Sequence, residues 1–223
     1  MKKTAILLVL ATILCSCVHI NINGGKTVKC GGDVVEQNMD FSGFTGVIVE
    51  GAAHIDFIQA NTFLVQVAAN EEVFNYLDYS MRGKNLVIST KDHVNINAKM
   101  YKVLIEAPVL RSINVEGAAE IHQPGSYKSE EGLEIDIDGA AKLEINKIEV
   151  PSLDITINGA GEFDISSIAV GVLEIEVNGA GSGSVSGVAD YAKLSVAGTA
   201  NIDARGLRCS NLEKKIEGFA VIR

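Results

Sequence analysis

LEIDIDGAAKLEI (residues 133–145) is the stretch that decides the fold, and it recurs as LDITINGAGEFDI at residues 153–165 and LEIEVNGAGSGSV at residues 173–185. In each copy, apolar and polar residues alternate on either side of a Gly-Ala pair. Alternation with a period of two indicates a β-strand with one buried and one exposed face. The recurring glycine also argues against a helix, which glycine weakens. Each repeat therefore predicts two short strands joined by a small-residue corner.

The small-residue corner recurs along most of the chain. Its seven glycines are Gly51, Gly117, Gly139, Gly159, Gly179, Gly198 and Gly218. From Gly117 onward, successive glycines are 22, 20, 20, 19 and 20 residues apart. A fixed period near 20 residues is typical of a solenoid, in which each repeat stacks on the one before it.

We therefore predict an all-β fold with a single domain: a right-handed parallel β-helix with coils of about 20 residues. Equivalent strands lie too far apart in the chain for tight hairpins, so parallel stacking about 4.8 Å apart is the simplest arrangement. The right hand follows from the general preference for right-handed crossovers. A β-sandwich also has short strands and frequent turns and is the alternative, although its spacing is usually less regular.

In such a stack, the apolar positions of successive coils form inward-facing columns. The predicted columns are Leu133, Leu153 and Leu173; Ile135, Ile155, Ile175 and Leu194; Ile137, Ile157, Val177 and Val196; Leu143, Phe163 and Ile202; and Ile145, Ile165 and Val185. A solenoid leaves an open edge at its end, and Lys214 and Lys215 would discourage pairing with another chain there.

The segment between the first two corners breaks the period. Its 66 residues from Gly51 to Gly117 match three coils of 22 in length but lack the corner motif. Within it, residues 70–76 predict a short helical or turn insertion, with Asn70 as the N-cap. Because the repeat breaks here, residues 70–100 are the first place to expect a binding site.

The N-terminus has the features of a bacterial lipoprotein signal peptide. Lys2 and Lys3 precede an apolar stretch at 6–14, and residues 14–17 (LCSC) resemble a lipobox. We expect a lipid anchor on Cys17 and cleavage before it; an ordinary signal peptide is the alternative. Three acyl chains would anchor the chain stably, and Val18 favours the outer membrane.

These features divide the chain into three parts. Residues 1–16 are the predicted signal peptide. Residues 17–40 form the lipidated N-terminus, a tether and an edge strand, and residues 41–223 form the β-helix domain. Cys30 and Cys209 could form a disulfide outside the cytoplasm, but two free thiols are equally compatible with the sequence.

The outward positions of the repeats carry columns of carboxylates. Glu134, Asp154 and Glu174 should stack in one column, and Asp136 and Glu176 belong to its neighbour. Because stacked like charges repel, such columns could recruit calcium through their oxygens. A solvated acidic face is the simpler interpretation, since the chain has no compact calcium loop. Asn158 and Asn178 should form a side-chain amide ladder beside the corners.

Charge and motifs exclude several classes of function. The formal net charge of −9 argues against nucleic acid as a partner. The chain has no nucleophile-elbow serine and no phosphate-binding glycine loop before a helix. His54 and His122 occupy nearly equivalent places after their corners, but surface histidines on strands explain them. With no Trp and 5% aromatic residues, a platform for stacking sugars is poorly supplied.

Three parts of the chain resemble one known family. They are residues 41–49 (FSGFTGVIV), residues 85–88 (NLVI) with 103–113 (VLIEAPVLRSI), and the serial corners. Together they resemble the "putative auto-transporter adhesin, head GIN domain" family over residues 34–223. The resemblance implies a parallel β-helix and an envelope lipoprotein of Bacteroidetes-type bacteria. This chain uses Ala where the family usually has Ser at the corners, which removes a ladder of hydroxyl groups.

The expected function is that of a non-catalytic, lipid-anchored envelope protein, an adhesin or binding module with a rigid acidic surface. Its partners would be the membrane, through the anchor, and a periplasmic or extracellular glycan or protein. Assembly of several copies is compatible with the sequence. A polysaccharide lyase or hydrolase on the same scaffold is the alternative, because β-helices also host such enzymes, and a structural envelope component is another.

Overall fold

The computed structural model describes residues 26–91 and 94–223, and almost every element is a strand. The elements are β1 (Thr27–Lys29), β2 (Val34–Met39), β3 (Gly46–Gln59), β4 (Leu64–Asn70), the 3₁₀ turn η1 (Glu71–Asn75), β5 (Leu77–Arg82), β6 (Asn85–Thr90), β7 (Asn95–Asn97), β8 (Tyr101–Ala107), β9 (Ser112–Gln123), β10 (Tyr127–Lys128), β11 (Leu133–Asn146) and β12 (Ile148–Ile222). The predicted all-β class is confirmed.

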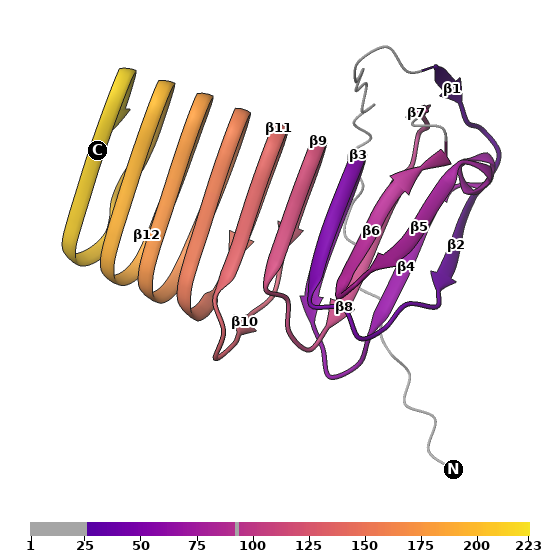
Figure 1. Cartoon of the computed structure of the whole chain (residues 1–223), viewed down its shortest axis with the longest axis horizontal. Coiled ribbons are helices and arrows are strands. Elements are labelled where there is room, and N and C mark those ends of the chain that lie inside the picture. The colour runs from indigo at the N-terminus through magenta and orange to yellow at the C-terminus, as the bar shows by residue number, and fades with distance from the viewer. Residues whose placement is uncertain (1–25, 92–93) are drawn as a thin grey trace.

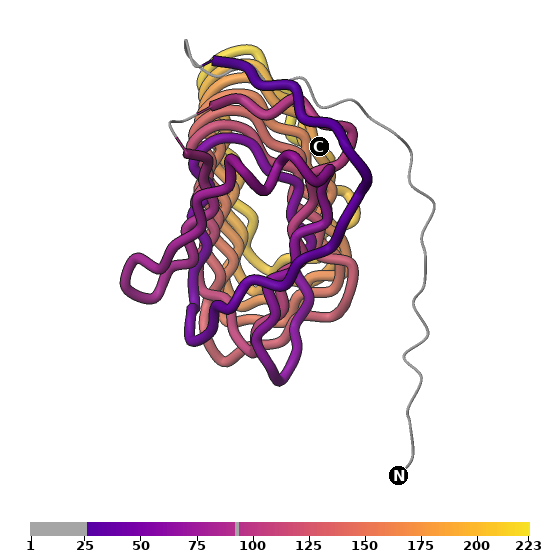
Figure 2. The backbone as a smooth tube through the Cα atoms, turned by 90° about the vertical axis from the view of Figure 1, so that its right-hand side faces the viewer, coloured from indigo at the N-terminus to yellow at the C-terminus, as the bar shows by residue number. Residues whose placement is uncertain are grey.

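The chain winds into coils that stack side by side (Figure 1). β3, β9, β11 and the start of β12 pair in parallel, and their corner glycines align: Gly51 with Gly117, Gly117 with Gly139, and Gly139 with Gly159. Figure 2 looks along the stack, where the coils superpose around a common interior. This parallel register is the predicted one and differs from the antiparallel pairing of a β-sandwich. The right hand of the coil stays a prediction.

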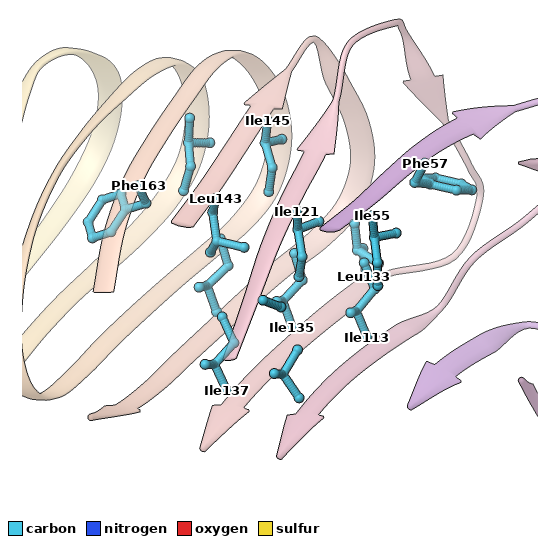
Figure 3. Packing of buried hydrophobic residues seen from close by; sticks show 14 of the residues in the cluster. Ile55, Phe57, Ile113, Ile121, Leu133, Ile135, Ile137, Leu143, Ile145 and Phe163 are labelled. Carbon is cyan, nitrogen blue, oxygen red and sulfur yellow. The ribbon is translucent and has the colours of Figure 1, made fainter. Parts of the chain in front are cut away.

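The core lies inside the coils, along the predicted columns. Leu153, Ile157 and Leu173 have no exposed surface. Figure 3 shows part of this cluster, in which Leu143 of β11 lies beside Ile121 of β9. The large ring of Phe163 is matched by a glycine in the next coil: a Cβ on Gly183 would lie 2.3 Å from that ring. The column therefore balances a large residue with the smallest one, as close packing requires.

The corners depend on glycine for two reasons. The corner glycines have φ between 119° and 144°, a region that L-residues rarely adopt. The coils also approach closely there, because a Cβ on Gly159 would lie 2.0 Å from the carbonyl oxygen of Gly139. Gly179, Gly198 and Gly218 repeat this contact with the preceding glycine at 2.1, 2.1 and 2.2 Å. The glycines thus fix both the bend and the stacking distance.

The segment between the first two corners breaks the coil repeat, and it does not form three coils although its length would allow them. β3 pairs directly with β9, which leaves no room for coils between them. Instead, β6 and β8 pair in parallel with the two halves of β3, and β5, β4 and β2 add antiparallel strands. The physical cause is local: Gly83, at φ 65°, makes a tight β5–β6 hairpin where a coil would need a long crossover.

Asn70 has a different role from the predicted one. η1 does follow it, but its side chain does not cap the turn. Asn70 Nδ2 donates to the Gly32 carbonyl oxygen at 2.9 Å, and Asn70 Oδ1 accepts from the Lys99 and Met100 amides at 2.9 and 3.0 Å. Asn70 is only 4% exposed. It therefore joins three segments of the N-terminal antiparallel region, in which β2 is the outermost strand.

Candidate functional site

A group of histidine, lysine and carboxylate side chains in mutual contact lies just beyond the first two corners. There the register places His54 of β3 between Lys102 of β8 and Glu120 of β9, and Asp56 opposite His122. All five side chains are on the outward face, because they alternate with the buried Ile55, Phe57 and Ile121. We call His54, Asp56, Lys102, Glu120 and His122 the histidine cluster.

Asp56 is the centre of the histidine cluster. Its Oδ1 lies 3.4 Å from both His54 Nε2 and His122 Nδ1, and its Oδ2 lies 2.6 Å from Lys102 Nζ. His54 Nδ1 is 3.0 Å from Glu120 Oε2. Burial raises the pKa of Asp56, but contacts with His54 and Lys102 outweigh it and lower the pKa from 3.8 to about 2. Asp56 is therefore ionised at neutral pH.

Two buried atoms of the histidine cluster have no hydrogen-bond partner among the described residues. They are His54 Nε2 and Asp56 Oδ1. The two atoms face each other at 3.4 Å, and His54 Nδ1 lies 3.0 Å from Glu120 Oε2, so each ring nitrogen of His54 faces a carboxylate oxygen. The accessible part of the histidine cluster is its rim, because the side chains of His54, His122, Glu120 and Lys102 are 28%, 33%, 34% and 38% exposed. These side chains can form hydrogen bonds with a ligand group such as a hydroxyl or amide.

The sequence contains a signal for the histidine cluster, although His54 and His122 are interpreted above as isolated surface histidines. His54 and Glu120 both follow their corner glycine by three residues, and Asp56 and His122 both follow by five. Once the corners are aligned, these positions must be neighbours. His54 and His122 are thus diagonal, and each contacts Asp56.

The acidic columns have the predicted register. Glu134 is in register with Asp154. The charge of Asp136, followed by burial, raises the pKa of Glu134, and burial followed by the charge of Glu174 raises the pKa of Asp154. In the part of the chain that the structure describes, no three His, Cys, Asp or Glu side chains are arranged to hold a metal ion. Calcium binding therefore receives no geometric support.

The predicted amide ladder is present beside the corners. Asn178 Nδ2 donates to Asn158 Oδ1 at 3.0 Å, and Asn158 Nδ2 donates to Asp138 Oδ1 at 2.9 Å. Asn178 also donates to Glu176, which belongs to the second acidic column, at 2.8 Å. These bonds link neighbouring coils and leave the amides engaged within the chain, which favours a structural role for them.

A shallow polar hollow of about 170 Å³ lies near the C-terminal end of β12. It is lined by Glu176, Asn178, Lys193, Ser195, Val196, Ala197, Lys215 and Glu217. Ser195 is 7% exposed, and its Oγ has no hydrogen-bond partner among the described residues. Lys215 and Glu217 pair at 2.9 Å across its rim. The hollow exists because the side chains of Ser195 and Ala197 are shorter than those of the lining residues Glu176, Asn178, Lys215 and Glu217.

The two cysteines of the described chain do not form the candidate disulfide. Both thiols are free. Cys30 follows β1 at the N-terminal end of the stack, whereas Cys209 belongs to the last coil of β12 (Figure 1). Burial, and then the charge of Glu72, raises the pKa of the Cys30 thiol. Cys17, the predicted lipidation site, lies outside the described residues.

A family model matches residues 43–223, and its description is "Putative auto-transporter adhesin, head GIN domain". The chain belongs to this family. The resemblance seen in the sequence is thereby confirmed over the whole coil region. No curated protein matches the sequence. Among the described residues, no helix is long and apolar enough to cross a membrane.

Solved structures from Bacteroidetes share the fold. A protein described as a putative adhesin from Parabacteroides distasonis has a TM-score of 0.75 at 20% identity, covering 88% of this chain and 84% of that one. A second one described so, from Bacteroides fragilis, has a TM-score of 0.69 at 13% identity, covering 87% and 98%. A protein described as a putative lipid binding protein from Parabacteroides distasonis has a TM-score of 0.66 at 16% identity, covering 88% and 98%.

Proposed function

We propose that this chain is a non-catalytic binding module of the cell envelope, held to the outer membrane by lipid on Cys17. The histidine cluster carries the proposal, because it gathers two imidazoles, a lysine and two carboxylates on one partly exposed outward face. A glycan hydroxyl or a protein amide would form hydrogen bonds with the exposed members of the cluster. The ligand is thus a periplasmic or extracellular glycan or protein that lies across β3 and β9.

Two observations support binding over catalysis. The family and the similar structures are described as adhesins or binding proteins rather than enzymes. In addition, general acid–base catalysis works best when the pKa of the group is near the working pH. Asp56, the most buried carboxylate of the histidine cluster, has a pKa of about 2 and is held by Lys102. It is therefore a poor proton donor or acceptor at neutral pH.

The anchor is tested by replacing the predicted lipidated cysteine in cells. Cys17→Ser should abolish incorporation of a fatty-acid analogue and move the chain from the membrane fraction to the soluble fraction. Cys15→Ser is the matched control and should remain labelled and membrane-bound. Continued labelling of Cys17→Ser would rule out the anchor at this residue.

The side of the membrane is tested by protease treatment of intact cells. Digestion of the chain, with a periplasmic protein left intact, places the module at the cell surface and supports adhesion. Protection until the outer membrane is permeabilised places it on the periplasmic face, where adhesion to another cell is excluded.

Binding is tested on a panel of envelope and host glycans and of envelope proteins. The wild-type chain should retain a ligand intact, with no cleavage products by mass spectrometry. Asp56→Asn and His122→Ala should weaken retention at least about tenfold, which corresponds to about 1.4 kcal/mol, whereas Glu134→Gln, in the acidic column, should not. Cleavage products would instead favour the polysaccharide-active enzyme.

A further inference from the structure

The C-terminal coil leaves apolar side chains exposed at one end of the molecule. Of the eight large apolar side chains that are exposed in the described part of the chain, four lie here: Leu212, Ile216, Phe219 and Val221, at 38%, 45%, 88% and 47% exposure. Figure 1 shows this coil at the end of the stack, whereas antiparallel strands β4 and β2 cover the opposite end. Leu212 and Ile216 follow the inward positions of Ala192 and Val196 in the coil before, whereas Phe219 and Val221 are at outward positions. In the described chain, the last coil thus exposes an unpaired strand edge beside Leu212 and Ile216, which is a surface for strand pairing.

Lys214 occupies an inward position in this last coil. The corresponding position of earlier coils holds Ile135, Ile155, Ile175 and Leu194, which are at most 1% exposed. Lys214 Nζ instead donates to the Ile222 carbonyl oxygen at 3.2 Å, so its side chain lies across the open end. Lys215, by contrast, points outward and pairs with Glu217. One charge is therefore placed where the next coil would stack.

A second copy of the chain is the partner whose shape and charge fit this end. A two-fold axis through the corner sets Gly218 over Gly218 and runs the two coils antiparallel. Even-numbered, inward positions then face even-numbered ones, so that Ile216 lies over Ala220. The same operation sets Glu213 over Arg223 twice, once on each side of the axis, which makes the end self-complementary in charge.

We propose that the C-terminal coil has the shape and charge to pair end to end with a second copy, and that Lys214 prevents this pairing. In the two-fold arrangement, both Lys214 ammonium groups would enter the joined core with no carboxylate opposite them. Removing two unpaired charges from water is strongly unfavourable, so the two lysines oppose the burial of the apolar side chains at the two ends. An inward-pointing charge on an edge strand is a known means of preventing such pairing. The native chain is therefore monomeric.

The test compares the mass of the full chain in mild detergent, measured by light scattering during size-exclusion chromatography. The wild type should be a monomer, and Lys214→Leu should raise the dimer fraction at least about tenfold at the same concentration. Lys215→Leu is the matched control, because it removes an equal charge from the outward face, and it should remain monomeric. Adding Ile216→Asp to Lys214→Leu should restore the monomer.

Four results would overturn the proposal. The first two are a Lys214→Leu chain that stays monomeric with native circular dichroism, and a wild-type dimer that Ile216→Asp disrupts. The other two are a Lys215→Leu chain that dimerises as much as Lys214→Leu, and a Lys214→Leu dimer that persists when Ile216→Asp is added. If Lys214→Leu precipitates, Lys214→Met is measured in its place, because methionine keeps a flexible side chain without the charge. The same results are expected of it.

Discussion

At the scale of single residues, the fold needs the corner glycines and Asp56 for different physical properties. A corner glycine is needed for its φ and for the absence of a Cβ, and both follow from where the chain bends and how closely the coils stack. Asp56 is needed for its charge, which two histidines and a lysine surround. The first requirement is visible in the sequence as a repeated motif. The second is visible only after the corners have been aligned.

Gly159→Ala should destabilise the fold far more than Gly51→Ala. Both glycines have positive φ, so each substitution costs about 1–3 kcal/mol of backbone strain. Only at Gly159 does the new Cβ also meet a carbonyl oxygen at 2.0 Å, whereas at Gly51 nothing lies within 4 Å. Overpacking adds about 1–3 kcal/mol at Gly159. Urea unfolding of both variants measures the difference, and equal losses of stability would contradict close stacking at the corners.

Asp56 should make folding stability depend on pH below about 4. Its pKa is about 2 in the folded chain and 3.8 when unperturbed. The lowered pKa contributes about 2 kcal/mol above pH 4, and this contribution is lost as the pH falls from about 4 to 2. Urea unfolding at pH 6, 4, 3 and 2 should therefore show a smaller loss for Asp56→Asn than for wild type. Parallel pH profiles would show that Asp56 has no such role.

At the scale of elements, the repeating strands and the N-terminal antiparallel region differ in how well the sequence predicts them. Residues 133–145 predict their strands, their inward residues and their neighbours, because one register satisfies every corner. The segment from β4 to β8 lacks the corner, so only its strands follow from local alternation. Its pairing depends on the β5–β6 hairpin and on Asn70, which are contacts between distant segments that alternation cannot specify.

Asn70→Ala should loosen the N-terminal antiparallel region while leaving the coils intact. The substitution removes three hydrogen bonds to Gly32, Lys99 and Met100 and leaves their backbone groups without the partner. The expected cost is about 2–4 kcal/mol, with faster hydrogen exchange at the Lys99 and Met100 amides. Asn38→Ala, which removes a single exposed bond to Gln66, is the control. Unchanged exchange at those amides in Asn70→Ala would contradict its role as a junction.

At the scale of the whole molecule, the stack has the histidine cluster on one outward face and exposed apolar groups at one end. The predicted location of a site, at residues 70–100, includes only the N-terminal antiparallel region. The histidine cluster lies beside that region, and of the β8 residues only Lys102 belongs to the cluster. Sequence patterns predict which residues point outward, but the contacts of Asp56 with both histidines depend on side-chain geometry.

The most direct test of the binding role is a hydrogen-exchange map of the full chain with and without the ligand retained from the panel. We expect slower exchange at residues 54–56 and 120–122, on β3 and β9, and no change at residues 133–138 or 212–219. The same map of Asp56→Asn at equal ligand concentration should show no protection. Protection confined to the acidic columns or to the last coil, or protection that Asp56→Asn retains in full, would contradict the histidine cluster as the binding site.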